Sequence, residues 1–365
     1  MFKRFYFFLL FLIVCAFSGC SFLTQKEPNS IRDFFAMDTY VKMILYGPEA
    51  EKAADALQAE MMRLDRQLSL YSETSDVSRL HQQLAVPSLP GSSSFQQTDA
   101  PRKELLTQSH AILLSEDTAE LLTRSLNLHA ETNGAFDITL SPVSTLWGFP
   151  HGPFRVPDKT EIQATLARTG METIRWDNRT RQFSADNPAI TLDFGGIAKG
   201  YAAEKMAAIL KKHNIRHALL NLGGNVKAIG TKPDRSLWRV AIQHPDAKTD
   251  YLGVLSVSDK SVVTSGDYER YFEKNKIRYH HILDPRTGSP ARSGLRSATI
   301  VCEDCTLADG LSTALFVLGP EAAISFWQKH KEQFQFILFT ENNTLFITEK
   351  LLPVFETKLT VTVVR

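Results

Sequence analysis

The stretch TLDFGGIAKGYAAEKMAAILKKHNIRHALLNL, residues 191–222, contains the features that decide the fold. Its first residues predict a strand that runs into the pair Gly195-Gly196, and helical spacing follows over 198–213. A second strand is predicted over 217–222, and it ends at another glycine pair. A chain that alternates so quickly between the two kinds of element indicates a fold that mixes helices and sheets.

The same alternation continues outward in both directions without a regular repeat. Apolar periodicity predicts helices over 49–68 and 118–131. Strands are predicted at 40–46, 238–242, 252–257, 297–302 and 335–340, and a β-hairpin is predicted over 344–364. Residues 84–103 are rich in Pro, Ser, Gly and Gln, which is typical of a solvent-exposed loop insertion. The whole pattern predicts an α+β fold with mainly antiparallel sheets.

The N-terminus has the order of an export signal. Lys3 and Arg4 precede an apolar run over 5–17, which is short for a membrane span of about 20 residues. Ser18, Gly19 and Cys20 then resemble a bacterial lipobox, in which the cysteine thiol is acylated. A plain secretory signal with an incidental cysteine is the alternative. We therefore expect a signal peptide at 1–19, a lipidated tether at 20–32 and one functional domain at 33–365.

Composition excludes several classes of protein. The 41 basic and 40 acidic residues nearly cancel, and no basic run appears in the mature part, which argues against a nucleic-acid partner. About 345 residues follow the signal, a length that suits one large domain or two interlocked lobes. Cys302 and Cys305 form a CxxC pair with no second ligand pair for zinc, so a local disulfide or two unpaired thiols are the remaining interpretations.

Two glycine turns are candidate binding elements. Gly195-Gly196 before a helix presents free backbone N–H groups, which suit a phosphate or pyrophosphate. The segment matches neither a dinucleotide fingerprint nor a Walker loop, so in isolation a simple tight turn is the better explanation. Gly223-Gly224 is a second place where the backbone can approach a ligand, or a plain β-turn.

Two further segments carry polar chemistry. Asp309 and Thr313 stand four residues apart in a helix-like segment, so their oxygens point the same way and suit Mg²⁺, although an Asp near a helix start is more often a cap. His280 and His281 are adjacent on a predicted strand, so only one of them can enter a site. Residues 284–288, DPRTG, are a turn by composition.

Together these segments resemble one family, the ApbE-type FAD:protein FMN transferases. Eight segments match in the family's order and extend over nearly the whole mature chain. They are 37–39, 69–71, 134–139 with 147–149, 192–201, 221–225, 264–270, 280–288 and 308–316.

The resemblance implies roles for particular residues. It implies two interlocked lobes around a cleft in which FAD contacts Met37, Tyr71, Ala135, Phe136, Asp137, Asp193, Lys199, His281 and Ile282. It also implies a Mg²⁺ site made by Asp309, Thr313 and the carbonyl group of Gly196, with Ser312 as a further ligand.

The resemblance also implies the reaction. A Ser or Thr hydroxyl of a target protein attacks the FMN-side phosphorus of FAD, and AMP leaves. Positioning and charge neutralisation should dominate such a transfer. Lys199 would supply a positive charge beside the metal. His281 is the candidate general base, with His280 and Asp284 behind it, and packing against the flavin ring is its alternative role.

The partner and the location follow from the same resemblance. The family's acceptor is a short motif, roughly Asp-x-x-Ser/Thr-Gly-Ala-Thr/Ser, on redox-pump subunits or flavin-carrying lipoproteins. This chain has no such stretch, so its acceptor should be another protein. We expect a periplasm-facing protein held in the bacterial envelope by its lipid anchor, with the inner membrane favoured over the outer. An FAD pyrophosphatase and a non-catalytic flavin carrier are the alternative functions.

Overall fold

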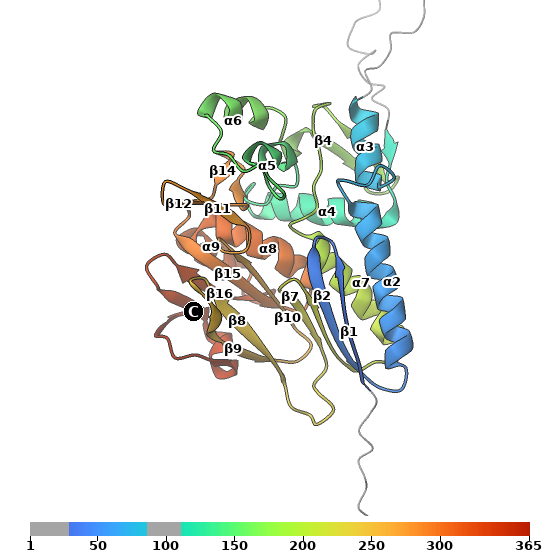
Figure 1. Cartoon of the computed structure of the whole chain (residues 1–365), viewed down its shortest axis with the longest axis vertical. Coiled ribbons are helices and arrows are strands. Elements are labelled where there is room, and N and C mark those ends of the chain that lie inside the picture. Colours follow the sequence, from blue (N-terminus) through green and yellow to red (C-terminus); the bar gives the residue numbers. More distant parts are fainter. Residues whose placement is uncertain (1–28, 86–110) are drawn as a thin grey trace, which may run out of the picture.

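A nine-stranded sheet lies at the centre of the molecule in the computed structural model, which describes residues 29–85 and 111–365 (Figure 1). All neighbouring strands are antiparallel except β17 and β19, which confirms the mainly antiparallel prediction. In spatial order the strands are β1 (Asn29–Ala36), β2 (Thr39–Tyr46), β6 (His217–Leu222), β7 (Asn225–Ile229), β10 (Ser261–Gly266), β15 (Leu295–Cys302), β16 (Gln335–Thr340), β17 (Leu345–Thr348) and β19 (Val361–Val364).

The N-terminal hairpin joins this sheet through a strand from much later in the chain. β1 pairs with β2, and β2 pairs with β6 in a register that places Leu45 opposite Ala218. The turn of the first hairpin is made by Met37 and Asp38, which both have positive φ. Two-residue turns of this kind match the twist of the flanking strands.

One face of the sheet is covered by the long helices α2 (Ala50–Leu68), α7 (Ala198–Lys212), α8 (Cys305–Leu318) and α9 (Pro320–Lys329) (Figure 1). Buried residues recur along α2 at three- and four-residue spacing, from Ala50 to Leu68, which gives the helix one apolar stripe. That stripe shares a core with sheet residues such as Met43 and Leu220. The periodicity seen in the sequence is therefore explained by this helix-on-sheet layer.

A small second sheet supplies another layer, and it is formed by β8 (Trp238–His244), β9 (Ala247–Val257) and β18 (Phe355–Glu356). Its order is β18-β9-β8, so β8 is an edge strand that pairs with β9 alone. Val240 and Leu255 pack with Val262 and Ile337 of the central sheet in a second core.

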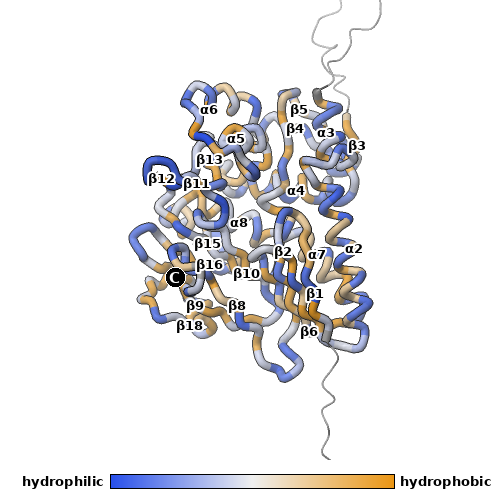
Figure 2. The backbone as a smooth tube through the Cα atoms, viewed as in Figure 1, coloured by the Kyte–Doolittle hydropathy of each residue, from blue (hydrophilic) through white to orange (hydrophobic). Residues whose placement is uncertain are grey.

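The remaining elements gather at one end of the central sheet in Figure 1. A local core of Trp147, Phe149, Ile162 and Leu283 holds part of this region together. In Figure 2 the turn at β12 is hydrophilic, whereas much of the hydrophobic colour follows the strands of the large sheet. The elements are α3 (Asp76–Ala85), β3 (Ile112–Leu113), α4 (Glu116–Glu131), α5 (Ser141–Trp147), α6 (Lys159–Leu166), η1 (Met171–Thr173), β4 (Ile174–Asp177), β5 (Gln182–Ala185), β11 (Tyr271–Lys274), β12 (Ile277–His280), β13 (Leu283–Asp284) and β14 (Ser289–Pro290).

Two predicted elements are wrong. Residues 344–364 do not form a hairpin, because β17 and β19 are parallel neighbours joined through η2 (Glu349–Val354) and β18. Parallel neighbours need such a crossover, and alternation of side chains alone does not reveal it. Residues 191–194 form no strand, since Leu192 N donates to His81 Nε2 (2.7 Å) and Asp193 N donates to the carbonyl of Ile138 (2.7 Å).

The other elements and features predicted from the sequence can be compared with the described residues. The remaining helices and strands lie where they were predicted, with ends shifted by a few residues. Leu84 belongs to α3, and the rest of the predicted 84–103 loop lies almost wholly outside the described residues, as do the signal peptide and Cys20. Cys302 and Cys305 are buried free thiols, so the unpaired interpretation holds. None of the described helices is long and apolar enough to cross a membrane.

Candidate active site

A cavity of about 910 Å³ draws its walls from distant parts of the chain. Its volume is in the range of sites that hold cofactor-sized ligands. All the described residues that the sequence singled out as FAD contacts line it, together with most of the predicted metal ligands. These residues are Met37, Tyr71, Ala135, Phe136, Asp137, Asp193, Gly196, Lys199, His281, Ile282, Asp309 and Thr313.

Asp309 is held where α7 and α8 touch. It is 4% exposed, and its Oδ2 accepts a hydrogen bond from the backbone N–H of Gly200 at 2.8 Å. Lys199 Nζ lies 3.8 Å from Asp309 Oδ1 and donates to the carbonyl of Gly195 at 3.3 Å. The helices approach closely here because position 200 has no side chain: a Cβ there would lie 2.2 Å from the carbonyl oxygen of Cys305. The contact between the helices therefore positions both charges.

Hydroxyl groups complete this corner of the cavity. Ser265 Oγ, on β10, lies 2.8 Å from Ser312 Oγ and 3.3 Å from Thr313 Oγ1. Ser312 is fully buried and donates to the carbonyl of Asp309 at 2.7 Å. Ser312 is absent from the cavity lining, so it supports Thr313 and Asp309 from behind. A Cβ on Gly196 would lie 3.8 Å from Thr313 Oγ1, which brings the glycine turn to the same corner.

The donor set of this corner fits Mg²⁺. Its lining residues could supply a carboxylate from Asp309, a hydroxyl from Thr313 and, as the resemblance implies, a backbone carbonyl from Gly196, all hard oxygen ligands. Among residues 29–85 and 111–365 there is no cluster of three His, Cys, Asp or Glu side chains that could hold a metal. A sparse protein ligand set is what Mg²⁺ takes when water and substrate phosphates fill its other positions.

The charge of the cavity also favours a bound cation. Its lining contains Lys199 and Arg270 as basic residues against six acidic ones: Asp38, Asp65, Asp137, Asp193, Glu269 and Asp309. Burial raises the pKa of Asp137 and of Asp193 because it disfavours their charged forms, and a nearby cation would favour those charged forms. A pyrophosphate entering this cavity would meet an excess of negative charge, which a divalent cation would offset.

Exposed aromatic side chains and the first hairpin turn also line the cavity. Met37 projects from the first hairpin turn, and Arg270 holds that turn by donating to the carbonyl of Asp38 (3.1 Å) and pairing with its carboxylate (2.9 Å). Tyr71 is 67% exposed, and its ring lies 5.6 Å from the ring of His151. An exposed tyrosine beside an open cavity is available to stack on a flat ligand ring.

His281 enters the cavity and His280 does not, as the sequence predicted. The Nδ1 atom of His281 lies 3.2 Å from the carbonyl oxygen of Arg270, which can only accept, so Nδ1 carries the hydrogen and Nε2 keeps its lone pair. Burial, with nearby Arg270, lowers the pKa of His281 to about 3. His280 is buried, with Nε2 3.0 Å from the carbonyl of Ala291, and Asp284 pairs with Arg286. Neither residue backs His281 in the way that was proposed.

Sequence reasoning missed Glu269. It lines the cavity between the charges of Lys199, Arg270 and Asp309. The protein around it limits its contact with bulk water and raises its pKa to about 7, although Lys199 and Arg270 oppose this shift. The sequence singled out its segment, 264–270, but a glutamate beside an arginine in sequence gave no sign that the carboxyl group faces the cavity.

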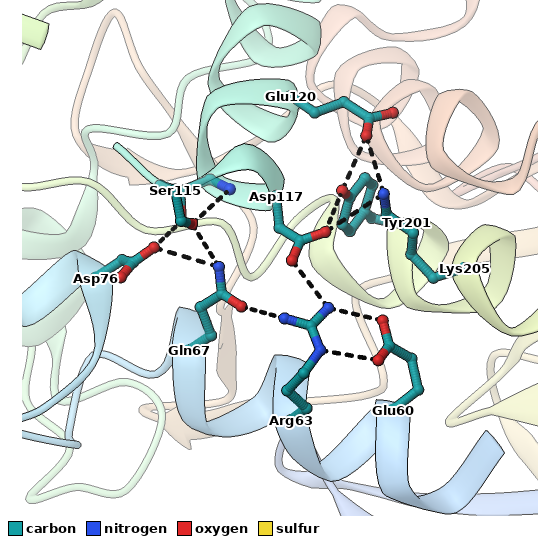
Figure 3. A network of polar contacts seen from close by, with 10 residues as sticks. Glu60, Arg63, Gln67, Asp76, Ser115, Asp117, Glu120, Tyr201 and Lys205 are labelled. Carbon is teal, nitrogen blue, oxygen red and sulfur yellow. Dashed lines mark hydrogen bonds and ion pairs between the residues drawn. The ribbon is translucent and has the colours of Figure 1, made fainter. Parts of the chain in front are cut away.

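A polar network behind the cavity anchors α7 (Figure 3). The Tyr201 hydroxyl oxygen lies 2.7 Å from an Asp117 oxygen and 2.9 Å from a Glu120 oxygen, so its one hydrogen is shared between them, and Lys205 pairs with both carboxylates. Arg63 of α2 reaches the other oxygen of Asp117 at 2.8 Å. The network ties α2, α4 and α7 together, and so it positions the helix that carries Lys199.

The molecule has a large, mainly antiparallel sheet, and its cavity lies where a glycine turn meets an acidic residue and hydroxyl groups. These features define an α+β ligand-binding protein, which differs from the parallel-sheet Rossmann class. Within that class the chain belongs to the ApbE family, whose family model matches residues 37–338.

Three comparisons illustrate this relationship. The FAD:protein FMN transferase of Escherichia coli is 29% identical over 322 residues, covering 86% of this chain and 85% of that protein. The crystal structure of the ApbE protein of Thermotoga maritima superposes with a TM-score of 0.76 at 29% identity, covering 88% and 98% of the two chains. The apo flavinyl transferase ApbE of Pseudomonas stutzeri gives a TM-score of 0.71 at 32% identity, covering 87% and 92%.

Proposed function

We propose that this protein is a Mg²⁺-dependent FAD:protein FMN transferase that attaches FMN to a Ser or Thr of another protein and releases AMP. The observation that carries the proposal is that one cavity brings the predicted FAD contacts together with Asp309, Thr313 and Lys199. The names of the aligned relatives, transferases that match most of both chains, support the same activity.

Asp309, Thr313 and the Gly196 carbonyl would hold Mg²⁺, which when bound neutralises charge on the pyrophosphate and on the departing AMP. Lys199 adds a positive charge at the same corner, where its ammonium group already lies 3.3 Å from the Gly195 carbonyl. Ser312 and Ser265 keep the Thr313 hydroxyl in place. The chain's own contribution at this corner is therefore preorganised charge and orientation.

The apolar part of the cavity would bind the flavin. Met37, Phe136 and Ile282 supply hydrophobic walls, and Tyr71 supplies a ring at the mouth. Phe149 meets His281 edge-on with ring centroids 6.4 Å apart, which holds the imidazole with its Nε2 lone pair available. These contacts would orient FAD so that its pyrophosphate reaches the Asp309 corner.

Two groups in the cavity are candidates to receive the proton of the acceptor hydroxyl. The depressed pKa of His281, about 3, makes its Nε2 a weak base, better suited to accepting a hydrogen bond that orients the hydroxyl. Glu269, with a pKa of about 7, matches the proton affinity that a general base needs near neutral pH. We therefore add Glu269 to His281 as a candidate base.

The proposal includes the location and the partner. An acyl anchor at Cys20 would hold the enzyme at the periplasmic face of a bacterial membrane, because the lipobox pattern follows an export signal. The partner would be a protein with the family's acceptor motif, such as a redox-pump subunit or a flavin-carrying lipoprotein. A Cys20→Ala variant should leave the membrane fraction, and its retention there in carbonate-washed membranes would contradict the anchor.

The central experiment incubates the chain without residues 1–20 with FAD, Mg²⁺ and an acceptor protein carrying the motif, and then weighs the acceptor by mass spectrometry. We expect a mass gain of one FMN that is lost in Asp309→Ala. Asp250→Ala is the control, because Asp250 is an exposed carboxylate outside the cavity lining. Free FMN and AMP with an unmodified acceptor would identify a pyrophosphatase, and intact bound FAD would identify a carrier.

A further inference from the structure

The turn before α8 is held by polar contacts that lie outside the cavity lining. Only Glu303 and Asp304 separate β15 from α8. Lys227 of β7 donates from Nζ to the carbonyl of Glu303 at 2.6 Å, and Ser261 of β10 donates to the same carbonyl at 3.3 Å. Arg124 of α4 pairs with Asp304 at 2.6 Å. The start of α8 is therefore fixed against two strands and a helix.

Glu204 of α7 reaches this turn as well. Its Oε1 accepts from Lys227 Nζ at 2.7 Å and from the backbone N–H of Cys305, the first residue of α8, at 2.6 Å. The N–H groups in the first turn of a helix have no partner inside the helix, so a carboxylate there is stabilising. The Lys227 and Glu204 side chains are 10% and 29% exposed, so their ion pair is largely removed from water. One carboxylate oxygen thus links β7, α7 and α8.

Two residues of α7 act on the same turn of α8. Gly200 and Glu204 are four residues apart, so they lie on one face of α7. Gly200 packs against the carbonyl of Cys305, and Glu204 accepts from the N–H of that same residue. Asp309 follows Cys305 by one helical turn, and its carboxylate accepts from the N–H of Gly200 at 2.8 Å. Both contacts of α7 therefore converge on the turn of α8 that presents Asp309 to the cavity.

The N–H of Gly200 depends on this arrangement. α7 begins at Ala198, so Gly200 lies in its first turn, where N–H groups have no acceptor within the helix. Among the described residues its one hydrogen-bond acceptor is Asp309 Oδ2. A shift of α8 relative to α7 would leave this N–H without an acceptor and would move the carboxylate. The Gly200 amide therefore reports the position of Asp309 directly.

We infer that Lys227 and Glu204 are positioning residues for the proposed metal site: their ion pair holds the first turn of α8 so that Asp309 meets Gly200 and faces the cavity. The inference rests on the proposed Mg²⁺-dependent function, although its structural part concerns the metal-free chain. Replacing a buried ion pair by apolar side chains often leaves stability unchanged or higher, so such a pair is best explained by the geometry that it fixes. Without Lys227, the partly exposed Glu204 is free to turn toward solvent and release the N–H of Cys305.

Two substitutions of Lys227 test the ion pair. Lys227→Met removes the charge at similar length, and Lys227→Arg keeps it. Thr348→Val is the control for a loss of stability alone, because Thr348 is a buried β17 hydroxyl that bonds to Phe336 and not to α7 or α8. Glu204→Gln is a second test if Lys227→Met fails to fold, since Glu204 is partly exposed and the new amide oxygen can still accept from Cys305.

Hydrogen exchange of the metal-free chain is the first readout, and it depends on neither Mg²⁺ nor turnover. The full chain is kept in detergent micelles with EDTA, and overlapping peptides isolate the Gly200 amide. We expect this amide to exchange about tenfold faster than in wild type in Lys227→Met and in Glu204→Gln, relative to the amides of residues 205–210 in the same helix. In Lys227→Arg and Thr348→Val the ratio should stay within about twofold of wild type.

Metal affinity is the second readout. The Mg²⁺ concentration that gives half of the maximal rise in Tm, measured with FAD bound, should increase about tenfold in Lys227→Met and return to the wild-type value in Lys227→Arg. An unchanged Gly200 exchange ratio in both Lys227→Met and Glu204→Gln would overturn the inference. An equal loss of Mg²⁺ affinity in Thr348→Val would also overturn it, because the effect would then be general destabilisation. A wild-type Mg²⁺ response that Lys227→Met leaves unchanged would refute the inference alone, whereas no Mg²⁺ response in wild type would refute the proposed metal dependence.

Discussion

Glu269 combines exposure to the cavity with a pKa of about 7, so near neutral pH its charge depends on small changes in conditions. The ordinary pKa of a glutamate is near 4.5, and burial raises it here. Between those two values the unfolded chain loses this proton while the folded chain keeps it. The carboxyl group therefore lowers the stability of the free protein progressively as the pH rises from about 4.5 to about 7.

A Glu269→Gln variant tests this charge. Ionised Glu269 repels the pyrophosphate, so in EDTA the affinity of the wild-type chain for FAD should fall about threefold to tenfold as the pH rises through 7. The variant should bind FAD with the same affinity from pH 5.5 to 8.5, and it should be more stable than wild type above pH 7. Fluorescence titration of FAD across this range measures the effect. A fall in affinity that persists in the variant would assign it to another group.

Single residues also show what sequence could and could not predict. The i, i+4 pair Asp309 and Thr313 was predictable because helical geometry alone puts both on one face. The alternation of a strand likewise predicted that only one of His280 and His281 enters the site. The depressed pKa of His281 and the position of Glu269 depend on the burial and charges around them, which come from segments distant in sequence.

Among the elements, the contact between α7 and α8 offers a sharp test. Gly200→Ala should destabilise the protein by about 1–3 kcal/mol and weaken Mg²⁺ binding, because the new Cβ would lie 2.2 Å from a backbone carbonyl oxygen and 2.7 Å from Asp309 Cβ. Gly310→Ala is the matched control on the partner helix. Its new Cβ meets the end of the Leu128 side chain at 2.3 Å, which can rotate away, and alanine favours a helix by about 1 kcal/mol.

Chemical denaturation with and without Mg²⁺ measures both changes. The ranking is the essential result: Gly200→Ala must lose more stability than Gly310→Ala. Equal losses of stability would mean that α7 and α8 can move apart without a further loss of stability. The close approach of the two helices would then not position Asp309.

The network of Figure 3 makes the anchoring of α7 sensitive to acid. Burial by itself would raise the pKa of Asp117, but hydrogen bonds from Tyr201 and Arg63 outweigh it and lower the pKa below its usual value. Its stabilising effect is therefore complete above the unfolded-state pKa of about 4 and is lost as the pH falls below that value. Asp117→Asn should cost about 1–3 kcal/mol at pH 7, and the difference from wild type should shrink toward pH 3.

Urea unfolding at several pH values follows this difference. Glu116→Gln is the control, because Glu116 is an exposed neighbour in the same first turn of α4. A loss of stability in Asp117→Asn that does not change with pH would show that the carboxylate acts by its shape and not by its charge.

Elements with strong periodicity were the most predictable part of the fold. Strand alternation located β6, and helical spacing located α2 and α7, because each buries one regular face. A continuous apolar run located β16, which is buried on both faces. The errors occurred where partners are non-local. β17 and β19 alternate like a hairpin but belong to a parallel pair, and residues 191–194 form no strand because their backbone bonds to His81 and Ile138.

At the scale of the whole molecule, ligand binding should stabilise the fold, because the walls of the cavity come from the first hairpin, the helical layer and the central sheet. FAD with Mg²⁺ at about 100 times its dissociation constant should add about 2.7 kcal/mol and raise the Tm by about 5 °C. The Mg²⁺-dependent part of this shift should disappear in Asp309→Ala. A thermal melt followed by tryptophan fluorescence measures it, and an identical Tm with EDTA or Mg²⁺ would contradict a metal at this corner.

The pairing of β2 with β6 sets the order in which the molecule can be completed. Leu45 faces Ala218, so as the chain emerges from its N-terminus the hairpin must wait for about 170 further residues before its neighbour is present. Throughout that interval β2 has an open edge, the kind of surface that recruits other unfinished chains. Any factor that shields this hairpin until β6 is available should therefore raise the yield of native protein.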